Sequence, residues 1–366
     1  MRPFRQLLPG PTLLLSLFLA VLLGGSGLHA AWAAVRVAVI ADYGDNSPNE
    51  AAVADLVHSF VPDIVVTAGD NSYDAGPIDT NIGKYYSRYI GNYSGGFPPG
   101  SSINRFFPCL GNHDYGDGGG VNAYLNYFAL PGASVQSSNT SGNERYYDFV
   151  YGPIHFFAIN SNPEEPNGRD STSVQAQWLR SQLAASNAPW KIVYFHHTAY
   201  SSGEHGGALP MRWPFRQWGA DAVIAAHDHD YERFLFDGFP YFVVGIGGSG
   251  LRGFRTTQPG SAVRYAANFG AMLITADAGE LSFDTFSIAS GNPLVDSYTL
   301  FGEGSVPQLT VSPLQYQFAS VTVGAMALTS FGLRNDGDVT LNVQSIALAG
   351  PHAGEFSAER GADVMP

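Results

Sequence analysis

Short apolar runs alternate with polar loops and helical stretches between residues 35 and 298. Five of these runs lack the polar alternation of a half-exposed strand, which predicts strands buried on both faces. They read VRVAVI, DIVVTAG, FFPCLG, KIVYF and AVIAA. Because strands and helices alternate and several β runs are adjacent, the pattern predicts an α/β fold of two mixed sheets flanked by helices over residues 34–303.

Local signals place two helices and one hairpin among these strands. Asn46-Ser47-Pro48 precede EAAVADLVHSF, with proline near the helix start. Thr172 and Gln175 fit a capping box in front of QAQWLRSQLAAS. The segments YYDFVYG and PIHFFAINS predict an antiparallel hairpin.

After Gly304 the pattern changes to alternating strands without a helix signal. The segments LTVSP and LTSFGLRNDGD resemble the immunoglobulin-like repeat of the choice-of-anchor type found on exported bacterial proteins. Residues 304–366 hold about half the strands that such a sandwich needs. We therefore expect a small, partial immunoglobulin-like all-β module here, and the resemblance implies attachment to a cell surface or to extracellular material.

The first 33 residues fit a secretory signal peptide. Arg2 and Arg5 precede the apolar stretch Leu13 to Leu23, and Ala31-Trp32-Ala33 supply the small-x-small cleavage pattern. The apolar stretch is too short to span a bilayer. We expect a secreted, periplasmic or extracellular protein without a membrane span.

The charge balance limits the partners of the protein. The 31 Asp and Glu residues outnumber the 18 Lys and Arg residues, which gives a formal net charge of −13. An acidic chain repels phosphate backbones, so nucleic acid is not expected as a partner. A small anionic substrate would need local cations to offset this field.

Residues able to bind metal follow the predicted strands. They are Asp42, Asp70, Asn112, His196, His227 and His229. In layered α/β proteins, functional residues collect outside the carboxyl ends of strands, so we expect these six side chains to meet. Each alone has an ordinary alternative, such as a turn or a helix cap. Together they offer more ligands than one metal ordinarily needs, which favours two metals that share a bridging carboxylate.

The order of these motifs resembles that of the purple acid phosphatases, metallophosphoesterases that carry a ferric ion. The matching segments are Asp42, GDNSY at 69–73, GNHD at 111–114, VYFH at 193–196 and HDH at 227–229. The resemblance covers residues 35–298 and implies the metallophosphoesterase four-layer sandwich. It also implies an acid phosphatase that hydrolyses small phosphomonoesters with a metal-bridged hydroxide, and the signal-peptide pattern makes this an exported enzyme.

Carried over by position, the resemblance gives each residue a role. The implied ferric ligands are Asp42, Tyr73 and His229. The implied ligands of a second, divalent ion (iron, zinc or manganese) are Asn112, His196 and His227. Asp70 is the implied bridge between the two metals. His113 and His205 are similar in placement to the substrate-facing histidines of the family, one of which would stabilise the phosphoryl charge or protonate the leaving alkoxide.

Tyr73 compensates for a departure from the wider metallophosphoesterase pattern. Many of these proteins have a histidine two residues after the first aspartate, and this chain has Gly44 there. The resemblance implies that Tyr73 supplies the missing ligand, since a phenolate is a hard anionic donor that suits Fe(III) better than Zn(II). The ordinary alternative is a tyrosine that packs over its loop.

Other hypotheses stay open at this point. A phosphodiesterase would use the same two metals and differ only in its substrate pocket, and a non-catalytic surface protein would use the domain to present a ligand. GIGGSG at 245–250 fits a dinucleotide motif, but LRGFRTTQPG after it cannot open the required helix. We expect this segment to be a strand-end loop near the site, and His58 and His155 to be structural.

Overall fold

The computed structural model describes residues 34–73, 77–117, 119–133, 135, 141–302, 309–312, 327–329 and 331–335. The chain divides into a unit that ends at Gly302 and a second unit that follows it, and each is described by itself. The predicted signal peptide and most of the predicted C-terminal module lie outside the described residues. Their boundaries at 33 and 303 stay predictions.

The first sheet has six strands in the order β13-β12-β11-β1-β2-β3. Its parallel strands are β1 (Val35–Ile40), β2 (Ile64–Thr67) and β3 (Phe106–Pro108). Its antiparallel strands are β11 (Gly270–Ala276), β12 (Glu280–Ser287) and β13 (Leu294–Phe301). Every residue of β2 and β3 is buried, as predicted for strands covered on both faces.

The second sheet has seven strands in the order β10-β8-β9-β7-β6-β5-β4. The parallel strands are β5 (Ile154–Ala158), β6 (Trp190–His197), β7 (Ala222–Ala226) and β9 (Phe239–Val244). The antiparallel strands are β4 (Tyr147–Tyr151), β8 (Tyr231–Phe236) and β10 (Ser261–Tyr265). The predicted hairpin is present as β4 and β5, which pair from Tyr147 with Ala158 to Tyr151 with Ile154.

The helices include two long ones at the predicted places. In chain order they are α1 (Pro48–Ser59), α2 (Lys84–Tyr86), α3 (His113–Gly116), α4 (Val121–Tyr127), α5 (Val174–Ala185) and α6 (Phe215–Trp218). Single turns of other helix types are η1 (Asp79–Gly83), η2 (Ser87–Tyr89) and η3 (Leu209–Met211). Ser47 caps α1 as predicted, because its Oγ accepts a hydrogen bond from the Glu50 N–H.

The capping box predicted at Thr172 and Gln175 is wrong by one residue. Ser173 is the N-cap of α5, and its Oγ accepts the Ala176 N–H at 3.2 Å. The Gln175 side chain instead bonds to the backbone N–H and C=O of Asn160. This tertiary contact holds the start of α5 against the segment after β5.

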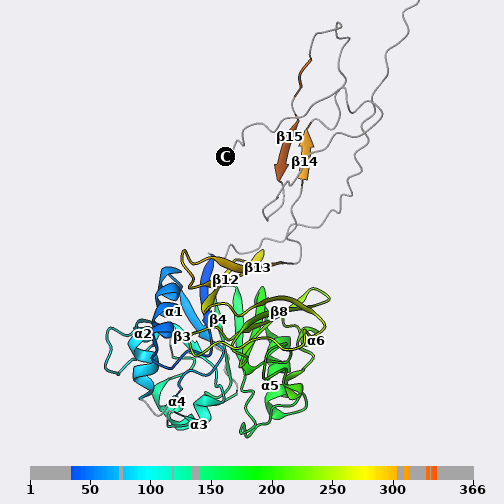
Figure 1. The fold of residues 1–366 in the computed structure, drawn as a ribbon. Helices are drawn as coiled ribbons and strands as arrows, with labels where there is room; N and C mark the ends of the chain where they lie inside the picture. Colours follow the sequence, from blue (N-terminus) through cyan, green and yellow to red (C-terminus); the bar gives the residue numbers. More distant parts are fainter. Residues whose placement is uncertain are drawn as a thin grey trace, which may run out of the picture. The chain divides into compact units, whose positions relative to one another are not determined.

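Two apolar cores define four layers. The larger core joins Val65 of the first sheet to Ile192 of the second sheet and to Val53 of α1. The smaller core joins Val193 of the second sheet to Leu179 of α5. Figure 1 shows α1 on one flank of the strands and α5 and α6 on the other. The order helix, sheet, sheet, helix confirms the predicted sandwich.

Glu50 is a buried carboxyl group in the first turn of α1. Its Oε2 accepts the Asn46 N–H at 2.6 Å, and Oε1 has no hydrogen-bond partner in the described part of the chain. Burial raises the pKa of Glu50 to about 9, against the lowering effect of the Asn46 N–H. The pKa of Glu50 is higher in the folded protein than in the unfolded chain. The contribution of protonated Glu50 to stability is therefore complete below about pH 4.5 and is lost as the pH rises toward 9.

We expect Glu50→Gln to raise the free energy of unfolding at about pH 8 by on the order of 2 kcal/mol, because glutamine needs no proton to stay neutral. At about pH 4.5 the variant should match the parent protein, which urea unfolding of metal-free protein at both pH values would measure. Glu164→Gln, at an exposed position, is the matched control. An equal gain at both pH values would contradict the prediction.

The second unit contains one described strand pair. β14 (Leu309–Ser312) and β15 (Gly332–Asn335) run antiparallel. These strands are compatible with an all-β module, and its immunoglobulin-like character stays a prediction. Within the described residues, no helix has the length and apolar character needed to cross a bilayer.

Candidate dinuclear metal centre

The predicted ligands converge from strand ends in both sheets. Asp42, Asp70 and Asn112 follow β1, β2 and β3, and His227 and His229 lie between β7 and β8. His196 was expected just past a strand end but lies inside β6. The strand reaches His197, which pairs with Ala226 of β7 after a register shift. Its carboxyl end nevertheless delivers His196 to the same edge.

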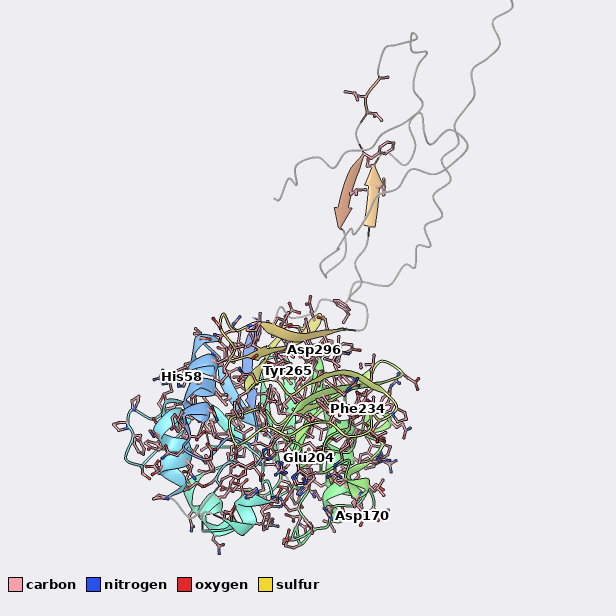
Figure 2. All side chains as sticks on the ribbon, viewed as in Figure 1. His58, Asp170, Glu204, Phe234, Tyr265 and Asp296 are labelled. Atoms are coloured by element: carbon pink, nitrogen blue, oxygen red, sulfur yellow. The ribbon has the colours of Figure 1, made fainter. Side chains whose placement is uncertain are left out.

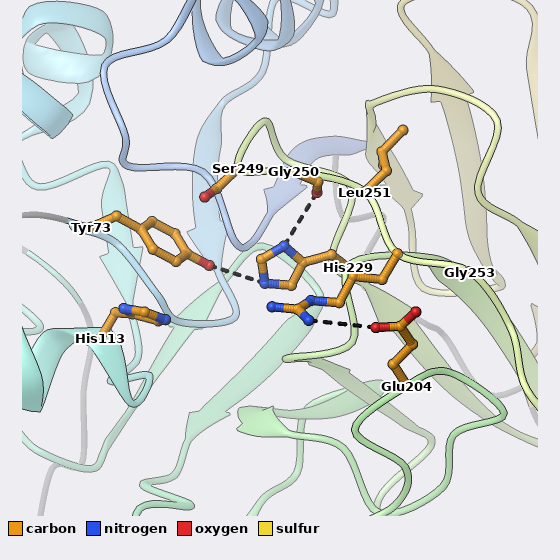
Figure 3. Close-up of a pocket in the computed structure, with 9 residues that line it drawn as sticks. Tyr73, His113, Glu204, His229, Ser249, Gly250, Leu251 and Gly253 are labelled. Carbon is orange, nitrogen blue, oxygen red and sulfur yellow. Dashed lines mark hydrogen bonds and ion pairs between the residues drawn. The ribbon is translucent and has the colours of Figure 1, made fainter.

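Asp42, Tyr73 and His229 form one group of donors. The Tyr73 hydroxyl lies 3.1 Å from Asp42 Oδ1 and 3.4 Å from His229 Nε2. Asp42 Oδ1 lies 3.5 Å from His229 Nε2. Figure 3 shows the Tyr73 hydroxyl directed at the His229 ring. Tyr73 is 8% exposed, and its polar end points inward, which argues against a ring that merely covers the loop.

Asn112, His196 and His227 form a second group. His196 Nε2 lies 3.0 Å from Asn112 Oδ1 and 3.2 Å from His227 Nδ1. Asp70, His196 and His227 each offer a ligand atom within 4.8 Å of the other two. Together with Asp70, the two histidines of the second group therefore have the composition and spacing of a metal site.

Asp70 touches both groups through one oxygen atom. Its Oδ2 lies 3.1 Å from the Tyr73 hydroxyl and 3.2 Å from His196 Nε2. A carboxylate in this position can bind a cation on each side, as the two-metal hypothesis requires.

Backbone carbonyl groups orient two of the imidazoles. His196 Nδ1 lies 3.0 Å from Ala68 O, and His229 Nδ1 lies 3.2 Å from Gly250 O. A carbonyl oxygen only accepts, so Nδ1 carries a proton in both rings, and Nε2 is the atom that can offer a lone pair to a cation. Such a partner for the second ring nitrogen is typical of metal-ligating histidines.

Three of the predicted ligands have left-handed backbone conformations. The φ angles are 53° at Asp42, 51° at Asp70 and 75° at His227. Such conformations raise the energy of non-glycine residues and persist where the surrounding structure fixes them. Here the Tyr73 N–H donates to Gly44 O at 2.7 Å, which fastens the turn after β1 to the turn after β2.

The same contact explains why position 44 is glycine. A Cβ atom at Gly44 would lie 1.7 Å from the backbone oxygen of Asn71. A histidine cannot occupy this position while the two turns are in contact. The close approach of the turns thus removes one ligand and brings Tyr73 to the centre.

Without a cation, protons must neutralise these donors. Burial raises the pKa of Tyr73 well above 10, and Asp42 and Asp70 raise it further. Burial lowers the pKa of His196, but Asp70 outweighs that effect and raises it to about 9. A phenol and an imidazolium thus lie against carboxylates in the metal-free protein. Bound cations would replace these protons and offset the free-energy cost of burying the carboxylates away from water.

The donor sets fit two different cations. The group around Tyr73 supplies mainly anionic oxygen, which suits a hard trivalent ion such as Fe(III). The group around His196 supplies two imidazoles, an amide oxygen and the shared carboxylate, which suits divalent iron, zinc or manganese. Both predicted metals are therefore compatible with the residues present.

His113 and His205 lie at the rim of this centre. His113 Nε2 is 4.0 Å from Asp70 Oδ2, and its ring centroid is 4.2 Å from that of Tyr73. The His205 ring stacks on the His227 ring at a centroid distance of 4.3 Å. Both imidazoles are at least partly exposed, which is compatible with the predicted substrate-facing position.

A pocket of about 520 Å³ opens beside the centre (Figure 3). Its walls come from the loops after β2, β3, β6, β7 and β9. The lining residues are Tyr73, His113, Glu204, His229, Ser249, Gly250, Leu251, Arg252 and Gly253. The GIGGSG segment is thus a strand-end loop near the site, as predicted. His58 bonds to Tyr89 and Tyr85, and Figure 2 shows it well away from Glu204 at the pocket.

The calcineurin-like phosphoesterase model matches residues 35–231. The chain belongs to this family. It is 25% identical to human tartrate-resistant acid phosphatase type 5 over 262 residues, which cover 63% of this chain and 78% of that protein. The relatives support phosphoester hydrolysis at a dinuclear metal centre.

Two solved structures share the fold of this phosphoesterase. A purple acid phosphatase from yellow lupin seeds matches with a TM-score of 0.59 at 19% identity, over 73% of this chain and 54% of that chain. GAP50, described as the anchor in the inner membrane complex of Plasmodium, matches with a TM-score of 0.56 at 18% identity. That match covers 74% of this chain and 89% of GAP50.

Sequence reasoning missed two buried aspartates that hold the phosphoesterase site together. Asp114 accepts hydrogen bonds from the Gly111 N–H and from the Asn71 side chain, both at 2.8 Å. Asp228 accepts the His205 N–H at 2.7 Å and so fixes the loop that carries this histidine. Both lie inside the GNHD and HDH motifs, but Asn71 and His205 are distant from them in sequence, so local pattern does not reveal these two contacts.

Proposed function

We propose that this phosphoesterase is an exported acid phosphatase that hydrolyses phosphomonoesters at an Fe(III)–M(II) centre. The divalent ion M is iron, zinc or manganese. The observation that carries the proposal is the position of Asp70 Oδ2, within 3.2 Å of both the Tyr73 hydroxyl and His196 Nε2. A shared carboxylate between an oxygen-rich and a nitrogen-rich donor group fits a pair of one trivalent and one divalent cation.

Two bound cations would polarise the phosphoryl oxygens and acidify an attacking water, so that no side-chain nucleophile is needed. The residues of the chain do the remaining work. Asp42, Asp70 and His229 would hold the two cations in place. Asp42 Oδ2 accepts the His227 N–H, Asp70 Oδ1 accepts the His113 N–H, and His229 Nδ1–H donates to Gly250 O, which orients the three side chains. His113 lines the pocket and would give a proton to the leaving alkoxide.

His113→Ala should lower turnover by about 100-fold or more, because general acid catalysis contributes on that scale. The metal content, measured by elemental analysis, should stay at the parental value, since His113 binds no metal in this proposal. His58→Gln, far from the pocket, is the control. Loss of metal from the His113 variant would instead give this histidine a structural role.

Tyr73→Phe tests the ferric site directly. Iron-loaded protein should show a phenolate-to-iron absorption band in the visible, because the Tyr73 oxygen would bind Fe(III) as a phenolate. The variant should lose the band while it keeps iron at the second group. A band that persists unchanged in the variant would disprove the assignment.

The function is tested by turnover of an aryl phosphomonoester and the matching diester from acid to neutral pH, with residues 34–366 and with iron and a divalent metal supplied. Faster monoester cleavage with an acid optimum is expected. A preference for the diester would make the protein a phosphodiesterase. No cleavage by metal-loaded protein would favour a binding function, for which the similarity in fold to GAP50 is the supporting observation.

Export rests on the signal-peptide pattern of residues 1–33. Expression of the full chain should release a protein whose N-terminal residue is Ala34 outside the cytoplasm. Attachment through residues 304–366 is proposed on the resemblance of LTVSP and LTSFGLRNDGD alone. An intact Met1 on the cytoplasmic protein would contradict export.

A further inference from the structure

The loop after β9 is tied rigidly to the candidate metal centre. The Arg252 N–H donates to His229 O at 2.9 Å, and His229 Nδ1–H donates to Gly250 O at 3.2 Å. The Ser249 N–H donates to Asp42 O at 2.9 Å. Because three hydrogen bonds join this loop to two predicted ligands, Arg252 has a fixed place in the pocket wall.

Arg252 is the only lysine or arginine among the lining residues of the described pocket. In the described part of the chain its guanidinium pairs with Glu204, at 3.6 Å between Nη1 and Oε2, rather than with Asp42 or Asp70. Figure 3 shows Glu204 on the opposite side of the pocket from Tyr73 and His113. A cation in this wall of an acidic protein is a local attraction for an anionic ligand.

The pair with Glu204 is weak enough to be exchanged. Both side chains are about two-fifths exposed, at 40% for Arg252 and 44% for Glu204, and exposed ion pairs at such distances contribute little. The Arg252 Nε atom is buried and has no hydrogen-bond partner within the described residues, so a ligand would meet the outer end of the guanidinium. Glu204 pairs with Nη1 there, and a phosphate or carboxylate could take a forked, charge-assisted contact with both Nη groups that Glu204 does not make.

We propose that Arg252 binds a second anionic group, carried by the leaving group of the substrate, and that Glu204 holds the guanidinium in the pocket until this group displaces it. The proposal rests on the proposed phosphatase function and narrows its substrate class. The preferred substrates would be small phosphomonoesters whose leaving group carries a carboxylate or another phosphate. A pocket of about 520 Å³ is within the size range of small-molecule sites.

Steady-state kinetics on phenyl phosphate and 4-carboxyphenyl phosphate tests this proposal, because the two esters differ by one anionic group. Arg252→Met should lower kcat/KM for the carboxylated ester by about 10-fold or more, mainly through KM, and change phenyl phosphate by less than about 2-fold. Glu204→Gln should lower KM for the carboxylated ester. Arg255→Met, in the same loop and exposed, is the matched control and should alter neither ester.

Two outcomes would overturn the proposal. Equal losses on both esters would mean that Arg252 binds the scissile phosphoryl group. Unchanged kinetics on both would mean that it binds no part of the substrate. Ratios of variant to parent protein are compared, so that the different reactivity of the two leaving groups cancels.

Calorimetric binding to metal-loaded protein gives a readout that is independent of turnover. Methylene bisphosphonate, with two anionic groups, should bind at least about 10-fold more tightly than inorganic phosphate, and Arg252→Met should remove most of that difference. If this preference holds but neither ester is cleaved, the phosphatase function fails and the anion site stands. If the esters are cleaved without the preference, the anion site fails alone.

Discussion

Asp70→Asn is expected to abolish phosphatase activity, with a loss of more than about 1000-fold. The substitution keeps the shape of the side chain and removes the charge that both donor groups share. The Tyr73 hydroxyl and His196 Nε2 would then face an amide instead of the common carboxylate oxygen. Elemental analysis should find one metal or fewer per chain, whereas the parent protein should bind two.

Asp237→Asn is a demanding control for this prediction. Asp237 also has a left-handed backbone, with φ 50° against 51° at Asp70, and lies exposed between β8 and β9. Asparagine tolerates that conformation, so backbone strain is matched in the two variants. Full activity of Asp70→Asn with two bound metals would remove Asp70 as the bridge.

Gly44→Ala is expected to destabilise the protein by about 3 kcal/mol and to displace Tyr73. The added Cβ would lie 1.7 Å from Asn71 O and 2.4 Å from Asn71 C, both backbone atoms. A flexible side chain could move aside, but this overlap can be relieved only if the turns after β1 and β2 separate. Those turns carry Asp42 and Asp70, so the variant should also lose metal and the visible absorption band.

Gly116→Ala separates this effect from a general effect of replacing glycine near the site. Gly116 lies in α3, and a Cβ atom there would have nothing within 4 Å. Thermal unfolding should leave this variant close to the parent protein. A Gly44→Ala protein with parental stability and metal content would show that the two turns are not held in contact.

Local sequence pattern was enough to predict most of the architecture. The apolar runs that end near Asp42 and Asp70 predicted buried strands, because apolar and polar residues do not alternate along them. A continuous apolar strand is stable only when both of its faces are covered. The helix start at Ser47 was predicted correctly, since that cap depends on adjacent residues. The start of α5 was predicted one residue early because Gln175 bonds to Asn160, a contact that local pattern cannot reveal.

The sequence by itself determined the fold class, the strands that lead into the site and the kinds of donor that follow them, because these depend on apolar runs and on residues next to them in the chain. Only the tertiary structure decided that Asp70 contacts both donor groups, that Gly44 packs against Asn71, and that Arg252 faces the pocket. These features depend on distances between segments that are far apart in sequence. Such distances are fixed by the packing of the two sheets and by the hydrogen bonds between their loops.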